Sequence, residues 1–273
     1  MTKLTALIFD VDGTLADTEE IHRLAFNAAF ADFNLDWNWS RQLYMELLSI
    51  SGGSERMRHY TESLGTAFKR PPDLDEYIAR LHRLKTEHYG RMLVEGHVKL
   101  RPGVERLLDE AQEQGIRLAI ATSTALSNVK TLLDNNLPES WGSWFEVIAS
   151  CDIIESKKPS PAVYQFVLAE MNVLPETCMA IEDTQNGNLA ALAAGIKTII
   201  TTHYFTRQHE FPGACLVIDT LGEPDQPFKV CSGDSMGARC VTIDLMRRLL
   251  GLTETRRGRS SRTAASLLDQ TCA

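Results

Sequence analysis

The sequence predicts an α/β protein with a doubly wound, Rossmann-like parallel sheet core and an inserted α-helical domain. Two observations predict this fold. After residue 98, short apolar runs of strand length alternate with helical periodicities, and such alternation produces a parallel sheet with helices on both faces. Residues 17–97, in contrast, repeat apolar residues at helical spacing with little clustering of β-branched residues, which indicates a helical insertion.

The elements of the core follow from short apolar runs and the residues that flank them. Residues 4–9 form a brief apolar run that ends at Asp10, and a run of this length without helical spacing is typical of a buried strand. Further strands are expected at residues 116–121, 145–149, 178–181 and 197–200, and helices at residues 104–111, 128–135, 162–171 and 188–194. Sheets of this kind bind ligands at the carboxyl ends of their strands, where this sequence carries polar residues.

These elements divide the chain into three parts. The core is expected to comprise residues 1–16 and 98–225, the helical insertion residues 17–97, and a C-terminal extension residues 226–273. Within the extension, residues 241–252 can form a helix. The final part contains the basic, Gly- and Ser-containing stretch 256–262, which indicates a flexible tail or, alternatively, an anion-binding one.

The composition excludes several classes of protein. The chain has 273 residues, 44% of them hydrophobic, and 28 basic against 36 acidic residues give a net charge of −8. That apolar fraction excludes a disordered chain, and the net acidity argues against nucleic-acid or anionic-membrane partners. The chain has no run of about 20 apolar residues, the length that spans a membrane. The six cysteines form no C-x-x-C pair and the N-terminus has no signal-peptide pattern, so we expect free thiols, a cytoplasmic or stromal location, and a monomer that acts on a small molecule.

The first candidate motif lies directly after the first strand. Asp10 and Asp12 stand two residues apart, and Gly13 beside them suits a turn that leaves the strand. One carboxylate can act as nucleophile and metal ligand, while the other acts as general acid and then general base. Because two adjacent carboxylates stay charged only beside a cation, Mg²⁺ is the expected cofactor. An acidic turn that only caps a helix is the alternative for this motif alone.

Two further strand ends carry groups that suit a phosphate. Thr122 and Ser123 follow the strand at 116–121 and can cradle a phosphate with backbone N–H groups at a helix start, although they equally suit a helix N-cap. Lys157 and Lys158 precede Pro159 in a loop that prolines make rigid, where a lysine can face an acid or a phosphoryl oxygen. A solvated basic turn is the alternative for these lysines.

The fourth motif is the pair Glu182 and Asp183, which follows the strand at 178–181 and can complete the oxygen ligands of Mg²⁺. A capped turn is again the alternative for this pair alone. The combination is more specific than its parts, because four strand ends of one sheet then carry the groups that phosphoryl transfer requires.

In chain order, spacing and strand-end placement, the four segments resemble the motifs of the haloacid dehalogenase superfamily, in its phosphatase branch, from about residue 4 to about residue 219. The insertion resembles the α-helical cap of the phosphoglycolate phosphatase and β-phosphoglucomutase subfamily. The resemblance implies that Asp10 becomes an aspartyl-phosphate and that Asp12 protonates the leaving oxygen and later activates water. It implies that Thr122 and Lys158 hold the phosphoryl group. The Mg²⁺ ligands that it implies are Asp10, the backbone carbonyl of Asp12, Glu182 and Asp183.

The insertion is most similar to that of one group, the CbbY-type sugar phosphatases of Calvin-cycle operons. The similarity lies in residues 15–22, 52–57 and 85–87 and extends to the loop 157–161. It implies that a phosphate is removed from xylulose-1,5-bisphosphate, an inhibitor of Rubisco. Ser54 departs from the pattern, because these proteins often carry a lysine in the Gly-Gly loop.

The same resemblance implies a set of substrate contacts in the core and the cap. Arg56 and Lys85 are the candidates for a second, non-reacting phosphate, since Arg can grip a phosphate with two N–H groups and Lys acts as a point charge. A surface charge is the alternative for each of them, and a surface or helix-packing histidine is the alternative for His22. The complete set is Glu19, His22, Gly53, Arg56, Lys85, Thr122, Ser123 and Lys158.

Other activities stay open at this point. A β-phosphoglucomutase or a phosphoglycolate phosphatase would have the same catalytic motifs, and only cap residues separate these enzymes. A phospho-accepting signalling domain also uses an acidic Mg²⁺ cluster, a phosphorylated Asp, a Thr or Ser and a Lys on a doubly wound sheet. The insertion of about 80 residues argues against such a domain, because it far exceeds an ordinary loop.

Overall fold

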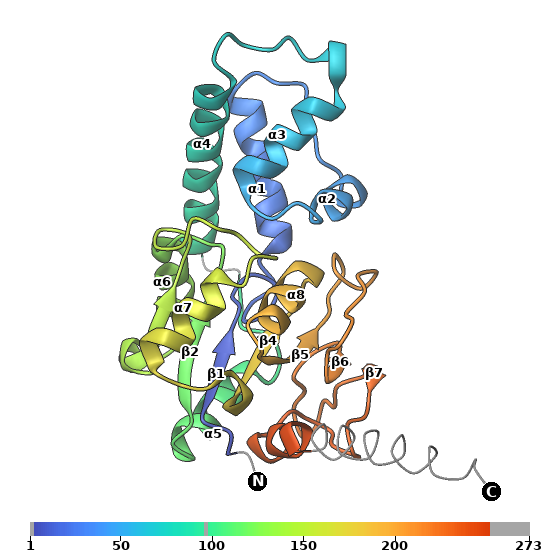
Figure 1. The fold of residues 1–273 in the computed structure, drawn as a ribbon. Helices are drawn as coiled ribbons and strands as arrows, with labels where there is room; N and C mark the ends of the chain where they lie inside the picture. The colour runs from blue at the N-terminus through green and yellow to red at the C-terminus, as the bar shows by residue number, and fades with distance from the viewer. Residues whose placement is uncertain (1–2, 96–97, 252–273) are drawn as a thin grey trace, which may run out of the picture.

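A seven-stranded sheet forms the centre of the molecule (Figure 1), in a computed structural model that describes residues 3–95 and 98–251. The strand order is β3-β2-β1-β4-β5-β6-β7; β1 to β6 are parallel, and β7 is antiparallel to β6. The predicted doubly wound α/β fold is therefore confirmed. The strands are β1 (Ala6–Phe9), β2 (Arg117–Ala121), β3 (Phe145–Ala149), β4 (Cys178–Glu182), β5 (Lys197–Thr201), β6 (Leu216–Ile218) and β7 (Val230–Gly233).

Helices cover both faces of the sheet because successive side chains of a strand point to opposite faces. Leu7 and Phe9 of β1 belong to a buried cluster with α5 and α6, whereas Ala6 and Ile8 belong to a second cluster with α7 and α8. Each short apolar run is thus buried on both sides, which is why it lacks polar alternation. These helices are α5 (Val104–Glu113), α6 (Leu126–Asp134), α7 (Ala162–Met171) and α8 (Gln185–Ala193).

The C-terminal extension contributes to the core as far as the structure describes it. β7 lies within this extension and adds the last strand to the sheet, although no strand is predicted there. Residues 243–251 are helical, and Ile243, Leu245, Met246 and Leu250 of this helix join the buried cluster of α5 and α6. The packed core therefore continues past residue 225. The predicted tail at 256–262 lies outside the described residues.

The insertion forms a separate helical layer above the carboxyl ends of the strands (Figure 1). Its stem is the antiparallel pair of long helices α1 and α4, and an aromatic cluster that includes Phe26, Phe30, Trp39 and Tyr44 fills its interior. We call this part, residues 17–97, the cap. Its elements are α1 (Glu19–Asp32), α2 (Arg41–Leu47), α3 (Gly53–Ser63), the short 3₁₀ helix η1 (Gly65–Ala67) and α4 (Leu74–Val94).

Two adjacent segments connect the cap to the core. Ala16 and Leu100 form an isolated antiparallel bridge, and the Arg101 N–H donates to the Leu15 carbonyl at 2.8 Å. The chain thus enters and leaves the cap side by side.

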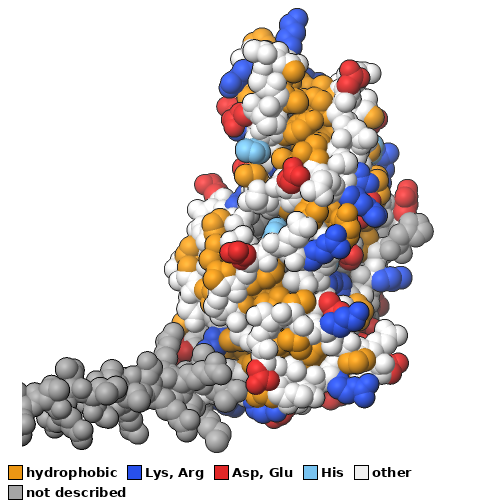
Figure 2. All heavy atoms as spheres, turned by 90° about the vertical axis from the view of Figure 1, so that its right-hand side faces the viewer, with side chains coloured by type: hydrophobic (Ala, Val, Ile, Leu, Met, Phe, Trp, Pro, Cys, Tyr) orange, Lys and Arg blue, Asp and Glu red, His pale blue; other side chains and the backbone are white. Residues whose placement is uncertain are grey.

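The surface carries charges of both signs. On the face that Figure 2 shows, lysine and arginine side chains lie near acidic ones in both the cap and the core. The net negative charge is therefore not gathered into one patch on that face. Among the described residues, no helix is both long and apolar enough to cross a membrane. The five cysteines that the structure describes are free thiols, as expected.

Candidate active site

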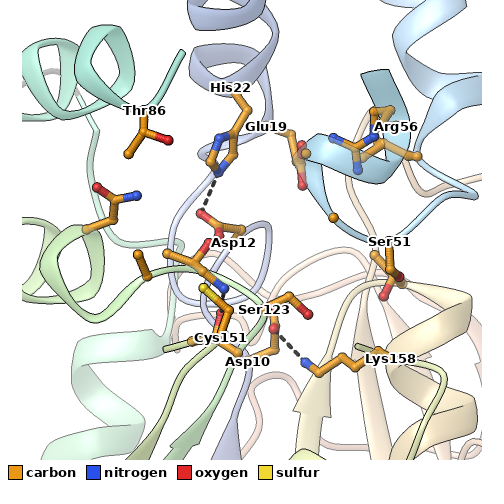
Figure 3. A pocket seen from close by; sticks show the side chains of 18 of the residues that line it. Asp10, Asp12, Glu19, His22, Ser51, Arg56, Thr86, Ser123, Cys151 and Lys158 are labelled. Atoms are coloured by element: carbon orange, nitrogen blue, oxygen red, sulfur yellow. Dashed lines mark hydrogen bonds and ion pairs between the residues drawn. The ribbon is translucent and has the colours of Figure 1, made fainter. Parts of the chain in front are cut away.

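The carboxyl ends of β1, β2 and β4 and the loop before α7 meet under the cap and form the floor of a cavity (Figure 3). This is the crevice expected of a doubly wound sheet, since β1 lies where the strand order changes direction. The cavity is lined by all the predicted catalytic, metal-binding and substrate residues except Glu182, which is fully buried and contacts Lys158.

Three carboxylates from two strand ends converge on the floor. Asp10 follows β1, Glu182 is the last residue of β4, and Asp183 follows it. Each offers one carboxylate oxygen, and these three oxygens lie within 4.8 Å of one another. All three side chains are buried. Burial and the neighbouring carboxylates raise the pKa of Asp10 and Asp183 well above the usual value, although Lys158 counteracts part of this effect.

Lys158 is the principal cation of this floor. Its Nζ donates to Asp10 Oδ1 at 2.7 Å and to the Ala121 carbonyl at 2.9 Å, and it also contacts Glu182. Burial alone would lower the pKa of Lys158, but Asp10 and Glu182 outweigh it and raise the pKa. Lys157, its neighbour, instead forms a more exposed ion pair with Glu55 of the cap.

The Glu182 carboxylate accepts two hydrogen bonds in addition to its contact with Lys158. The Tyr164 hydroxyl on α7 donates to Glu182 Oε1 at 2.6 Å, and the Asp183 N–H donates to Oε2 at 3.2 Å. Gly187 of α8 makes room for this carboxylate, because a Cβ at Gly187 would lie 2.0 Å from Glu182 Oε2. Glu182 is therefore fixed between Lys158 and α8.

The carboxylate set fits a divalent cation. Three buried carboxylates face one lysine, which leaves an excess of negative charge in a region shielded from water. Carboxylate and carbonyl oxygens are the ligands that Mg²⁺ prefers. The Asp12 carboxylate is not part of this set and points toward the cap.

Asp12 lies at the junction of core and cap. Its Oδ1 accepts hydrogen bonds from Thr18 at 2.6 Å and Tyr89 at 3.2 Å and lies 3.0 Å from His22 Nε2, while Oδ2 accepts from Thr124. Burial alone would raise the pKa of Asp12, but His22 and the hydroxyl donors outweigh it and lower the pKa. Three of these four partners belong to the cap, so the position of the cap determines the surroundings of this carboxylate.

The cap side of the cavity carries a buried lysine without a carboxylate partner. Lys85 of α4 is 6% exposed, and its Nζ lies 2.6 Å from His22 Nδ1. Within the part of the chain that the structure describes, Lys85 forms no ion pair with an acid. Burial lowers the pKa of Lys85 to about 8, although Asp12 raises it in part. His22 stacks on Tyr89 with ring centroids 3.9 Å apart.

Arg56 lines the same cavity but is largely engaged within the cap. Its guanidinium donates to the carbonyls of Leu47 at 3.1 Å and Ile50 at 3.2 Å and to the Tyr44 hydroxyl at 3.2 Å. Tyr44 in turn donates to Glu19 Oε2 at 2.6 Å. Three of the five guanidinium N–H groups are thus used, and two remain for a ligand.

The Gly-Gly loop and the phosphate-cradle residues also border the cavity. Gly52 has a φ of +96° and precedes α3, so Gly53 begins that helix instead of continuing the predicted loop. A Cβ at Gly53 would lie 2.6 Å from His82 Nε2. Thr122 accepts the Thr124 N–H at 3.1 Å, and Ser123 lies beside it on the cavity wall (Figure 3).

Sequence reasoning missed two buried residues near this floor. Arg101 donates to four carbonyl oxygens, including that of Gly13 beside Asp12. His203 Nε2 lies 2.9 Å from Asp183 Oδ2, and burial lowers the pKa of His203 to about 4. His203 follows β5, so a fifth strand end with polar residues was the signal that could have identified it.

The fold and the site define a hydrolase, and comparison with known proteins agrees. Residues 7–201 match the family model of haloacid dehalogenase-like hydrolases, so the chain belongs to this family. It is 46% identical over 225 residues to the plasmid-encoded CbbY protein of Cupriavidus necator, a match that covers 82% of this chain and 89% of that protein. These relationships make the chain a phosphatase, a phosphoric monoester hydrolase.

Two solved structures are informative. A mutant of CbbY from Rhodobacter sphaeroides in complex with xylulose-1,5-bisphosphate superposes with a TM-score of 0.73 at 42% identity, covering 80% of this chain and 94% of that one. A putative β-phosphoglucomutase from Thermotoga maritima gives a TM-score of 0.56 at 26% identity, covering 78% and 93%.

Proposed function

We propose that this phosphatase is Mg²⁺-dependent and hydrolyses xylulose-1,5-bisphosphate through an aspartyl-phosphate on Asp10. One observation carries the proposal: a single cavity has a buried carboxylate cluster with Lys158 on its core side and the buried, unneutralised Lys85 on its cap side. A substrate with two phosphates satisfies both ends. The complex of the Rhodobacter sphaeroides relative with this bisphosphate supports the choice of substrate.

The core side performs the chemistry. Asp10 attacks phosphorus, so that a bond forms from its carboxylate oxygen while the bond from phosphorus to the sugar oxygen breaks. Asp12 donates a proton to that sugar oxygen and then takes one from the water that hydrolyses the aspartyl-phosphate. Lys158 and Thr122 orient the phosphoryl group, since positioning and charge neutralisation dominate such a transfer.

Mg²⁺, when bound, neutralises phosphoryl charge and lets the phosphate approach the Asp10 carboxylate. Asp10, Glu182, Asp183 and the Asp12 backbone carbonyl would hold it. Lys158 shares in this charge neutralisation, because it pairs with both Asp10 and Glu182.

The cap side selects the substrate. A buried cation without a counter-ion is costly, and an anionic group of the ligand would compensate Lys85. Arg56 can add its two remaining N–H groups. Ser54, in the first turn of α3, offers only a hydroxyl where CbbY-type proteins often carry a lysine. Lys85 therefore carries more of the charge that faces the distal phosphate. Hydrolysis of this bisphosphate would remove an inhibitor of Rubisco.

A phosphate-release screen tests the proposal. The full chain is assayed with and without Mg²⁺ on xylulose-1,5-bisphosphate, ribulose-1,5-bisphosphate, phosphoglycolate and hexose phosphates. We expect Mg²⁺-dependent release and the highest kcat/KM for xylulose-1,5-bisphosphate. A higher value for phosphoglycolate would overturn the substrate assignment.

A second assay separates hydrolysis from mutase activity. The enzyme is incubated with β-glucose 1-phosphate and a trace of glucose 1,6-bisphosphate, and no glucose 6-phosphate is expected. Rapid conversion would favour a β-phosphoglucomutase.

A further inference from the structure

His203 stands directly behind one of the proposed metal ligands. Its Nε2 lies 2.9 Å from Asp183 Oδ2, and the two side chains are only 4% and 1% exposed. His203 lies just past the end of β5, which pairs with β4, and Asp183 directly follows β4. It does not line the cavity, so its role is toward Asp183 and not toward the substrate.

The hydrogen bonds of the ring assign its tautomer. The Phe205 N–H donates to His203 Nδ1 in a long hydrogen bond of 3.4 Å, so Nδ1 is an acceptor and carries no proton. The proton therefore sits on Nε2 and is donated to Asp183 Oδ2. Thr14 donates to the other oxygen of Asp183, Oδ1, at 3.5 Å. The carboxylate is thus oriented from both sides.

The same segment reaches into the cap. Phe205, two residues beyond His203, is 3% exposed and belongs to the aromatic cluster of the cap. Its ring centroid lies 5.5 Å from that of Tyr44 at an interplanar angle of 86°, and 6.1 Å from that of His203. The backbone that holds the imidazole is therefore anchored in the cap.

We infer that His203 is a positioning residue that orients the Asp183 carboxylate for Mg²⁺, and that Phe205 anchors the backbone of His203 in the aromatic cluster of the cap. The inference rests on the proposed Mg²⁺ dependence. Residues that orient a metal ligand in this way typically contribute about 10–100-fold to metal affinity. A carboxylate hydrogen-bonded in this way would keep its remaining lone pairs available to the ion.

Mg²⁺ binding to the full chain without substrate tests the inference by isothermal titration calorimetry. His203→Ala and His203→Phe both remove the donor, and Phe also fills the volume of the ring in case the alanine variant unfolds. We expect the Kd for Mg²⁺ to rise about 10–100-fold in both. His203→Gln keeps an N–H near the Nε2 position and should restore most of the affinity.

The matched control is His88→Ala. His88 also contacts a carboxylate at 2.8 Å, that of Asp32, but on the cap surface, so its removal should leave the Kd unchanged. If folded His203→Phe binds Mg²⁺ with wild-type affinity, the role of His203 is overturned while the proposed metal dependence stands. Absence of Mg²⁺ binding by the wild-type chain would overturn both this inference and the proposed metal dependence.

Discussion

Replacing Arg101 by Met should destabilise the core more than any surface substitution. Arg101 is 8% exposed and forms no ion pair within the described residues; instead its guanidinium donates to the carbonyls of Gly13, Thr201, Thr202 and Asp219. Met matches the length of the side chain but donates nothing. Each buried carbonyl that loses its donor costs about 1–3 kcal/mol.

The net effect is smaller than the sum of these costs. Removing the buried guanidinium also removes its desolvation penalty, and the Asp219 carbonyl lies close enough to the surface to be partly rehydrated. We therefore expect the free energy of unfolding to fall by about 3 kcal/mol. With a urea m-value of about 3 kcal/mol/M, the upper end for single domains, the midpoint should fall by about 1 M.

Urea unfolding followed by circular dichroism measures this change. Arg207→Met is the control, because Arg207 is exposed and stacks on Tyr204 with its guanidinium 4.6 Å from the ring centroid. It should shift the free energy of unfolding by less than about 0.5 kcal/mol. A loss below about 1 kcal/mol in Arg101→Met would refute the reasoning that these four carbonyls depend on one side chain.

Three further predictions concern activity. Asp10→Asn should abolish phosphate release while circular dichroism shows an intact fold, and substantial residual turnover would contradict its role as nucleophile. Lys85→Ala should raise the KM for a bisphosphate more than the KM for a monophosphate. Lys85 has a pKa of about 8, so it is charged below that pH and neutral above it. In the wild-type enzyme, kcat/KM for the bisphosphate should therefore fall as the pH rises through about 8. Lys85→Arg should move that fall to higher pH. An equal fall in kcat/KM for a monophosphate would contradict the role of Lys85 toward the second phosphate. Gly187→Ala should lower kcat, because its Cβ would displace the Glu182 carboxylate and with it Lys158; an unchanged kcat would show that the pair tolerates displacement.

The elements that sequence reasoning located are those whose pattern is local. The strand at 145–149 and the helix at 162–171 agree with β3 and α7 to the residue, since their apolar runs are bounded by polar or proline residues. β6 and β7 were not predicted. β6 has only three residues, and β7 is exposed and pairs antiparallel at the sheet edge, so neither has a buried apolar run of strand length.

The residues of the site likewise divide into those that a local sequence pattern predicts and those that it does not. Asp10, Lys158, Glu182 and Asp183 could be grouped from sequence, because parallel strands bring their carboxyl ends to one edge. The partners of Glu182 and Asp183, such as Tyr164 and His203, depend on how a helix and a loop approach those strands. The polar strand end after β5 could have placed His203 at this edge of the sheet, but no local pattern records which carboxylate His203 or Tyr164 contacts.

The side-by-side entry and exit of the cap have a consequence for modularity. Because Ala16 and Leu100 are already paired, the ends of the inserted segment are held together by the core, and closing this long loop adds little to the entropic cost of folding. A different insert, or a short turn, can therefore replace the cap without changing the register of β1 against β2. Such a replacement would keep the cluster of Asp10, Lys158, Glu182 and Asp183. It would remove three of the four partners of Asp12 and leave Phe205 exposed to solvent. The carboxylate cluster and the cap thus lie in separable lengths of chain, whereas the surroundings of Asp12 require both.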